Sequence, residues 1–263
     1  MKSKAEKLKK QRVTDSTKNI DGTGTTEWAG IQNGLPRCVE VLMAIVILLI
    51  ALPILSLAAL LIALTSRGSV LFRQRRVGQG GHEFVMYKLR TMRRRTSGLQ
   101  VTAADDRRVT SVGKILRKAK LDELPELWNV IRGDMALLGP RPEVPRYVDL
   151  RNPLWQQILQ ARPGITDPVT LRLRNEEKLL GAVEGDRERF YLEELQPYKL
   201  IGYVEYLQAR NWRNDVKLLK DTAIGIVRPT TTPVPTFRQI RECVRNYSLR
   251  PSERSGRTQW QQE

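Results

Sequence analysis

The stretch VLMAIVILLIALPILSLAALLIAL, residues 41–64, contains 24 residues without a charge, and only Pro53 and Ser56 interrupt its apolar series. A helix of this length extends about 36 Å at about 1.5 Å per residue, enough to cross the apolar core of a bilayer. The preceding residues, 1–40, are mostly polar, so a cleaved secretory signal is disfavoured. The stretch therefore predicts a membrane-embedded helix, and a helix buried in a soluble core is the alternative.

Pro53 and the flanking charges bear on how this helix meets the membrane. A proline in a helix interior removes one backbone hydrogen bond and crowds the preceding turn, which predicts a break. Residues 1–40 carry eight Lys and Arg against five acids, and residues 66–95 carry nine against one. Because basic residues stand on both sides, we expect a re-entrant segment over 36–66 with both ends at the cytoplasmic face, rather than a span.

The composition limits the classes of partner and chemistry. The chain has 263 residues, 45 Lys and Arg against 28 Asp and Glu, and a formal net charge of +17. Such a surface favours nucleic acid, lipid headgroups or phosphorylated substrates. Two cysteines cannot build a disulfide framework. His82 is the only histidine, which disfavours a zinc site built on His and Cys and any catalytic triad that does not use His82 as its base.

The remaining sequence predicts an α+β catalytic region over 67–228 between two basic tails, 1–35 and 229–263. Two short strands, 69–73 and 83–89, surround the glycine-rich turn VGQGG and predict a hairpin. Helical spacing indicates two pieces over 113–132 and an amphipathic helix over 203–227, suited to the membrane interface. The segment RPTTTPVP, 228–235, is expected to end the folded part because its prolines cannot continue a helix.

Two adjacent carboxylates open the stretch LDELPELWNVIRGDMALLGPRPE, residues 121–143. Asp122 and Glu123 precede a helical pattern, and acids at that position are commonly helix caps, which is one interpretation. The other is chemical, because Lys and Arg residues stand on both sides and favour an ionised, nucleophilic carboxylate. A carboxylate that attacks phosphorus makes an acyl phosphate, with a divalent cation offsetting the phosphate charge. Adjacent acids suit a glycosidase poorly, so phosphoryl chemistry is favoured.

Several motifs occur together in a specific order: the proline-interrupted helix, FRQRRVGQGGHEFVMYKLRTM at 72–92, DRRVTSVGKILRKAKLDELPELWNVIRGDMALLGPRPE at 106–143, and RPGIT at 162–166. In this arrangement the chain resembles, over residues 37–225, the monotopic phosphoglycosyl transferases, a bacterial sugar transferase family. The resemblance implies transfer of a sugar-1-phosphate from a nucleoside diphosphate sugar, usually a UDP-sugar, to a polyprenol phosphate such as undecaprenyl phosphate. The nucleoside monophosphate, UMP for a UDP-sugar, is released. It also implies a location at the cytoplasmic face of the bacterial inner membrane and a role in starting exopolysaccharide or glycoconjugate synthesis.

The resemblance also implies roles for individual residues. Asp122 matches the nucleophile that takes up the phosphosugar and lies beside the family's Mg²⁺, and Glu123 matches the second acid. Phosphate-binding roles are carried over to Lys88, Arg90, Arg117 and Arg141. The chain departs from the family pattern where Leu52 instead of serine precedes Pro53, at Ala119 and Lys120 before the carboxylates, and at Asp167 after RPGIT.

Two non-enzymatic alternatives remain open at this point. One is a membrane-tethered basic protein that binds nucleic acid or anionic lipid, with the carboxylates acting only as caps. Nucleic acid is not expected, because 121–143 lacks interleaved aromatic residues and no DNA-binding motif is recognised. The other is a scaffold for a glycan-assembly complex. Membrane lipids, a second copy of the chain and other glycan-assembly enzymes are candidate partners.

Overall fold

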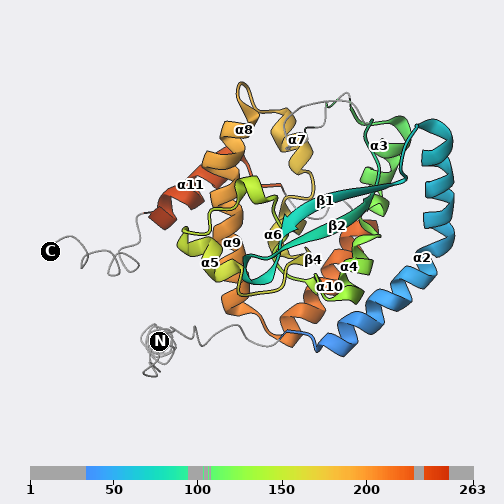
Figure 1. The fold of residues 1–263 in the computed structure, drawn as a ribbon. Coiled ribbons are helices and arrows are strands. Elements are labelled where there is room, and N and C mark those ends of the chain that lie inside the picture. The colour runs from blue at the N-terminus through green and yellow to red at the C-terminus, as the bar shows by residue number, and fades with distance from the viewer. Residues whose placement is uncertain (1–33, 94–102, 104–105, 107, 228–233, 249–263) are drawn as a thin grey trace.

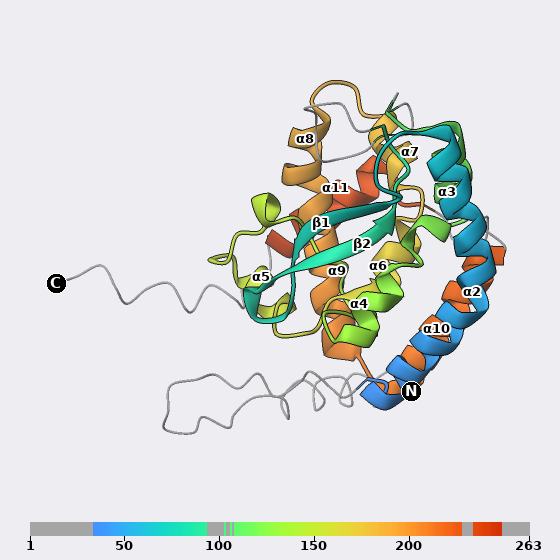
Figure 2. The same cartoon turned by 45° about the vertical axis from the view of Figure 1, so that its right-hand side comes forward.

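A computed structural model describes residues 34–93, 103, 106, 108–227 and 234–248. The tail expected over 1–35 lies outside the described residues except for its last two positions. The structure mixes helices with strands, as the α+β prediction expected. Its described residues form two small sheets, of which the sequence predicted only the hairpin. In both Figure 1 and Figure 2, the long helix α2 and the short helix α5 (Pro153–Ile158) lie on opposite sides of the molecule.

Helix α2 (Arg37–Thr65) contains the whole apolar stretch and continues through Pro53. By length and composition it could cross a membrane. Figure 1 shows that it is bent and follows the edge of the domain. The helix is continuous from Arg37 to Thr65, so the predicted break at Pro53 does not interrupt it. The re-entrant topology stays a prediction.

One narrow stripe of α2 is buried against the domain, and the rest of the helix exposes apolar side chains. Small side chains in the stripe let the helix backbone approach its neighbours closely. The buried positions are Glu40, Ala44, Ala51, Ala58 and Ile62. Leu49, Ile50 and Leu64 are among the exposed ones, and each leaves 60% or more of its surface uncovered. An apolar surface of this extent fits a membrane contact.

Arginine side chains fix both ends of α2. At its beginning, Arg37 donates to the carbonyl oxygens of Val130 and Met135, at the end of helix α4 (Glu126–Arg132). At its end, Arg90 donates to the carbonyl oxygens of Ser66 and Arg67 at 2.7 and 2.9 Å. The last carbonyls of a helix lack intrahelical partners, so a guanidinium is well placed there.

The predicted hairpin is confirmed, with a longer first strand. Strands β1 (Leu71–Val77) and β2 (Glu83–Leu89) pair antiparallel around the single turn η1 (Gln79–Gly81). Gly80 and Gly81 both have positive φ, which a side chain would resist. The sequence reading ended the first strand at residue 73, whereas pairing continues to Val77 because the tight turn begins only at Gly78.

The region 113–132 forms the two predicted helical pieces, with a turn between them. These are α3 (Ser111–Lys118), the 3₁₀ turn η2 (Leu121–Glu123) and α4. Strand β3 (Ala136–Leu138) then pairs in parallel with β4 (Gly164–Thr166). A Cβ atom on Gly164 would stand 2.1 Å from the amide nitrogen of Gly139, so the close approach of these two segments requires glycine.

The second half of the domain is a set of helices packed around one apolar core, which includes Leu195, Leu200 and Tyr203. They are η3 (Pro145–Tyr147), α5, α6 (Pro168–Arg172), α7 (Glu176–Gly181), α8 (Arg187–Phe190), η4 (Tyr191–Leu195) and α9 (Gln196–Ala209). Helix α10 (Trp212–Val227) instead contributes Leu218 to a second apolar cluster, with Leu138 and Leu207. Helix α10 exposes Trp212 and Val216. That exposure fits an interfacial position, which stays a prediction.

The prediction of a single helix over 203–227 is wrong. The chain leaves the helix at Arg210, whose ψ of 130° is extended. Its guanidinium donates to Asp215 and to the carbonyl oxygen of Leu138, both at 3.1 Å. Asn211 then starts α10 by accepting from the amide of Asn214. Apolar spacing that continues across both helices hid this break.

The flexible tail predicted over 229–263 is also wrong for part of its length. Helix α11 (Phe237–Ser248) packs against η4 and α9. Ile240 is fully buried, and the ring of Phe237 meets that of Phe190 edge to face at 5.3 Å. Phe237 and Ile240 therefore pack this mostly polar helix against the domain. Two apolar residues are too few to predict a packed helix from the sequence pattern.

Candidate active site

The adjacent carboxylates lie in the turn η2 between α3 and α4. Lys120 enters this turn with φ of 57°, the left-handed region, and so redirects the chain. Helix α4 begins after Pro125, and no side chain caps it. Asp122 is 7% exposed, and its Oδ1 atom is buried without a hydrogen-bond partner. The capping interpretation of the pair is therefore wrong for α4, and one carboxylate oxygen is left available.

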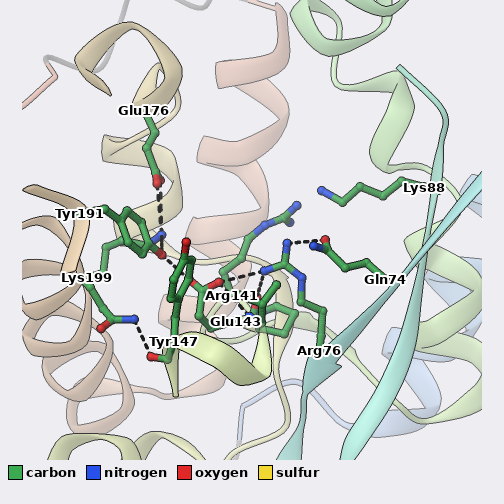
Figure 3. Close-up of polar contacts among 12 residues, drawn as sticks. Gln74, Arg76, Lys88, Arg141, Glu143, Tyr147, Glu176, Tyr191 and Lys199 are labelled. Carbon is green, nitrogen blue, oxygen red and sulfur yellow. Dashed lines mark hydrogen bonds and ion pairs between the residues drawn. The ribbon is translucent and has the colours of Figure 1, made fainter. Parts of the chain in front are cut away.

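Glu123 belongs to a cluster of two acids and two cations. Lys88 from β2 lies 3.2 Å from both Glu123 and Glu126. Arg141, in the loop after β3, lies 2.6 Å from Glu123 and 3.1 Å from Glu126. Figure 3 shows Lys88 and Arg141 pointing toward one another from the hairpin and from this loop. The structure thus brings together Lys88, Arg141 and Glu123, while the phosphate-binding and catalytic roles that the resemblance implies for them stay predictions.

Glu126 is a member of this cluster that the sequence analysis missed. It is fully buried, and both of its partners also contact Glu123. A signal was present, because Glu126 stands three residues after Glu123, the spacing of side chains on one helical face. Buried acids are rarely tolerated without partners, so Glu126 holds Lys88 and Arg141 in place.

Burial and charge act differently on the two adjacent acids. Burial raises the pKa of Asp122, and the negative charge of Glu123 raises it further, against the opposing effect of Lys88, Lys120 and Arg117. Burial would also raise the pKa of Glu123, but Arg141 and Lys88 outweigh it and hold that pKa well below its usual range. The sequence analysis expected the surrounding cations to favour the ionised form of both carboxylates. Their effect prevails at Glu123, whereas burial outweighs it at Asp122.

The two remaining predicted phosphate ligands have other partners. Arg117, on α3, donates to the hydroxyl of Thr91 at 2.9 Å and pairs with Glu177 of α7 at 2.6 Å. Its charge still acts on Asp122. Arg90 is buried, and its guanidinium holds the end of α2. Arg90 thus serves a structural contact in this structure, and a role at phosphate is not supported by its geometry.

A second polar network fixes the loop that carries Arg141. Glu143 pairs with Arg76 of β1 at 3.1 Å and accepts a hydrogen bond from the hydroxyl of Tyr191. Lys199 of α9 donates to the same hydroxyl at 3.3 Å and pairs with Glu176 at 3.4 Å. Figure 3 shows this chain of contacts running from the hairpin to α7 and α9. The position of Arg141 thus depends on elements far apart in the sequence.

The residues present fit Mg²⁺ only in part. Among the described residues, no group of three or more His, Cys, Asp or Glu side chains converges as a metal site. The unpartnered oxygen of Asp122 could serve as a ligand without giving up a hydrogen bond found among the described residues. Magnesium commonly binds through one or two carboxylates, water and substrate phosphates. The arrangement therefore fits an ion that is held jointly by Asp122 and a phosphorylated substrate.

Comparisons with known proteins identify the family of this chain. The family described as bacterial sugar transferase matches residues 31–229. A UDP-glucose:undecaprenyl-phosphate glucose-1-phosphate transferase of Caulobacter vibrioides is 40% identical over 196 residues, 73% of this chain and 69% of the relative. A UDP-N-acetylgalactosamine-undecaprenyl-phosphate N-acetylgalactosaminephosphotransferase of Aeromonas hydrophila is 40% identical over 137 residues, 50% of this chain and 32% of that longer protein. The exopolysaccharide production protein ExoY of Rhizobium meliloti is 37% identical over 161 residues, 53% of this chain and 70% of the relative.

Fold, carboxylate turn and relatives together define the class of protein: it is an enzyme, a sugar-phosphate transferase. More particularly, the chain belongs to the bacterial sugar transferase family. The family resemblance found in the sequence motifs is confirmed.

Proposed function

We propose that this enzyme transfers a sugar-1-phosphate from a UDP-sugar to polyprenol phosphate through a covalent intermediate on Asp122. The reaction would take place at the cytoplasmic face of the bacterial inner membrane and start exopolysaccharide or glycoconjugate synthesis. The observation that carries the proposal is the buried, unpartnered oxygen of Asp122 beside a cluster of Lys88, Arg141, Glu123 and Glu126. Relatives named for undecaprenyl phosphate transfer support the choice of substrates.

In the first step, a carboxylate oxygen of Asp122 attacks the phosphorus that carries the sugar. The bond from this phosphorus to the bridging oxygen of the diphosphate breaks, and UMP leaves with that oxygen. Lys88 and Arg141 would bind phosphate oxygens, and their ion pairs with Glu123 and Glu126 support this role because they keep both cations oriented. Asp122 would hold Mg²⁺, which would supply positive charge that reduces the repulsion between carboxylate and phosphate.

In the second step, a phosphate oxygen of polyprenol phosphate attacks the same phosphorus. The bond to Asp122 breaks, its carboxylate is regenerated, and the sugar leaves on a polyprenol diphosphate. A covalent intermediate lets two polyanionic substrates use one set of cations in turn. Ping-pong kinetics is the signature of such a mechanism.

Intact mass spectrometry tests the intermediate. The full chain in detergent is incubated with Mg²⁺ and single UDP-sugars, without acceptor, and we expect one phosphosugar adduct together with one equivalent of UMP. Adding polyprenol phosphate should remove the adduct. A protein that only binds anionic lipid or nucleic acid, or that only serves as a scaffold, would release no UMP. UMP release without an adduct, and only in the presence of acceptor, would contradict the covalent mechanism.

The raised pKa of Asp122 predicts an acid limb in the pH dependence of UMP release. Attack requires the carboxylate, so the rate should fall as the pH drops through this pKa. Lys120 lowers the pKa of Asp122, so the Lys120→Met variant should lose activity at a higher pH than the unaltered protein. The exposed Lys118, on α3, offers the control Lys118→Met. Identical acid limbs for both variants would contradict this assignment.

A further inference from the structure

An apolar groove lies between α2, the hairpin and the start of α4. It has a volume of about 460 Å³. Pockets of about 300–1,000 Å³ are typical of small-molecule sites. Its walls include Leu55, Ala59, Tyr87, Leu89, Pro125 and Trp128. Trp128 is half exposed at this site, which is unusual for a large aromatic side chain without a partner.

Two walls of the groove, strand β2 and the start of α4, adjoin the turn that carries Asp122 and Glu123. Tyr87 and Leu89 lie on one face of β2, and Lys88, between them, points from the other face to Glu123. Pro125 follows Asp122 by three residues. One strand and one turn of chain therefore separate an apolar groove from the cations of the candidate active site.

The third wall of the groove is the apolar helix. Leu55 and Ala59 line the groove next to the buried stripe of α2, and the neighbouring Leu57 and Leu60 are exposed. An apolar chain can therefore pass from the outer surface of α2 into the groove without crossing a charged surface. Ser56, the hydroxyl of Tyr87 and the indole N–H of Trp128 are the polar side-chain groups among the described lining residues, and none of them is charged. A UDP-sugar, which is polar throughout, has no complement here.

We propose that the groove binds the phosphate-proximal isoprene units of the polyprenol phosphate acceptor. This inference rests on the proposed function, since it assigns the acceptor of that reaction to a surface. The acceptor joins an apolar chain to a phosphate, and the structure joins an apolar groove to a cationic cluster across one strand. Only the first units fit in about 460 Å³, so the rest of the chain stays in the bilayer.

The variant Ala59→Phe fills the groove and tests the proposal. We expect the KM for undecaprenyl phosphate to rise about tenfold or more, whereas exchange of labelled UMP into the UDP-sugar, which needs no acceptor, stays unchanged. Ala63 is exposed one turn further along α2 and does not line the groove, so Ala63→Phe is the matched control and should leave both rates unchanged. Trp128→Ala, which removes a half-exposed wall, should also raise the KM and serves if Ala59→Phe does not fold.

The outcomes separate this inference from the proposed function. An unchanged KM in both groove variants, with normal UMP exchange, would overturn the groove assignment and leave the covalent mechanism standing. Absence of UMP exchange in the unaltered protein would instead overturn the mechanism. A rise in KM that occurs in phospholipid nanodiscs but vanishes in lipid-free detergent would indicate that a bilayer phospholipid fills the groove, which also overturns the proposal.

Discussion

Asp122→Asn is expected to lower UMP release by about 10³-fold or more, because the amide keeps the shape of the side chain but has no charged oxygen to attack phosphorus. The variant should form no phosphosugar adduct. Its folding should be little changed, since burial already disfavours the charged form of Asp122. The measurements are UMP release, intact mass and thermal unfolding in the same detergent.

The control for this prediction is Asp149→Asn. Asp149 is exposed and pairs with the exposed Arg151, so its loss should leave both UMP release and the adduct intact. If Asp122→Asn retained either the adduct or a rate within tenfold of the unaltered protein, Asp122 could not be the nucleophile.

Arg141→Met is expected to have the largest effect on stability. It leaves the buried carboxylates of Glu123 and Glu126 with Lys88 as their shared partner. Removing one member of a buried ion cluster typically costs about 3–5 kcal/mol of unfolding free energy. UMP release should fall as well, because Arg141 is proposed to contact phosphate. Denaturant unfolding in detergent measures the first effect, and Arg151→Met, on the exposed pair with Asp149, is the control with little expected change.

The pH dependence of this loss in unfolding free energy gives a second check on Arg141→Met. The lowered pKa of Glu123 means that its ionised form stabilises the folded protein above the ordinary pKa of glutamate, and that this contribution is lost as the pH falls. The gap in unfolding free energy between Arg141→Met and the unaltered protein should therefore shrink in acid. Glu126→Gln added to Arg141→Met should recover part of the stability at neutral pH. A gap that is constant with pH and insensitive to Glu126→Gln would show that the cost arises from lost packing.

The hairpin and the helical pieces around the carboxylates were predictable because their signals are local. Alternation and a glycine-rich turn define β1 and β2, and apolar spacing defines α4. The break at Arg210 was not predictable in the same way. There the backbone leaves the helix, and the Arg210 guanidinium donates to Asp215 and to the carbonyl oxygen of Leu138, which is 72 residues away. Helix α11 was missed because only two of its apolar residues, Phe237 and Ile240, belong to the described apolar core.

By itself, the sequence determined the family, the apolar helix and the adjacency of Asp122 and Glu123, because these follow from residue order and local periodicity. Only the tertiary structure decided which cations serve the site. It placed Lys88 and Arg141 on Glu123, added the buried Glu126, and engaged Arg90 with the end of α2. The physical reason is that burial and ion pairing depend on contacts between segments distant in the chain. Folding therefore separates charges that look equivalent along the sequence into those that contact the carboxylates of the candidate site and those that hold other elements in place.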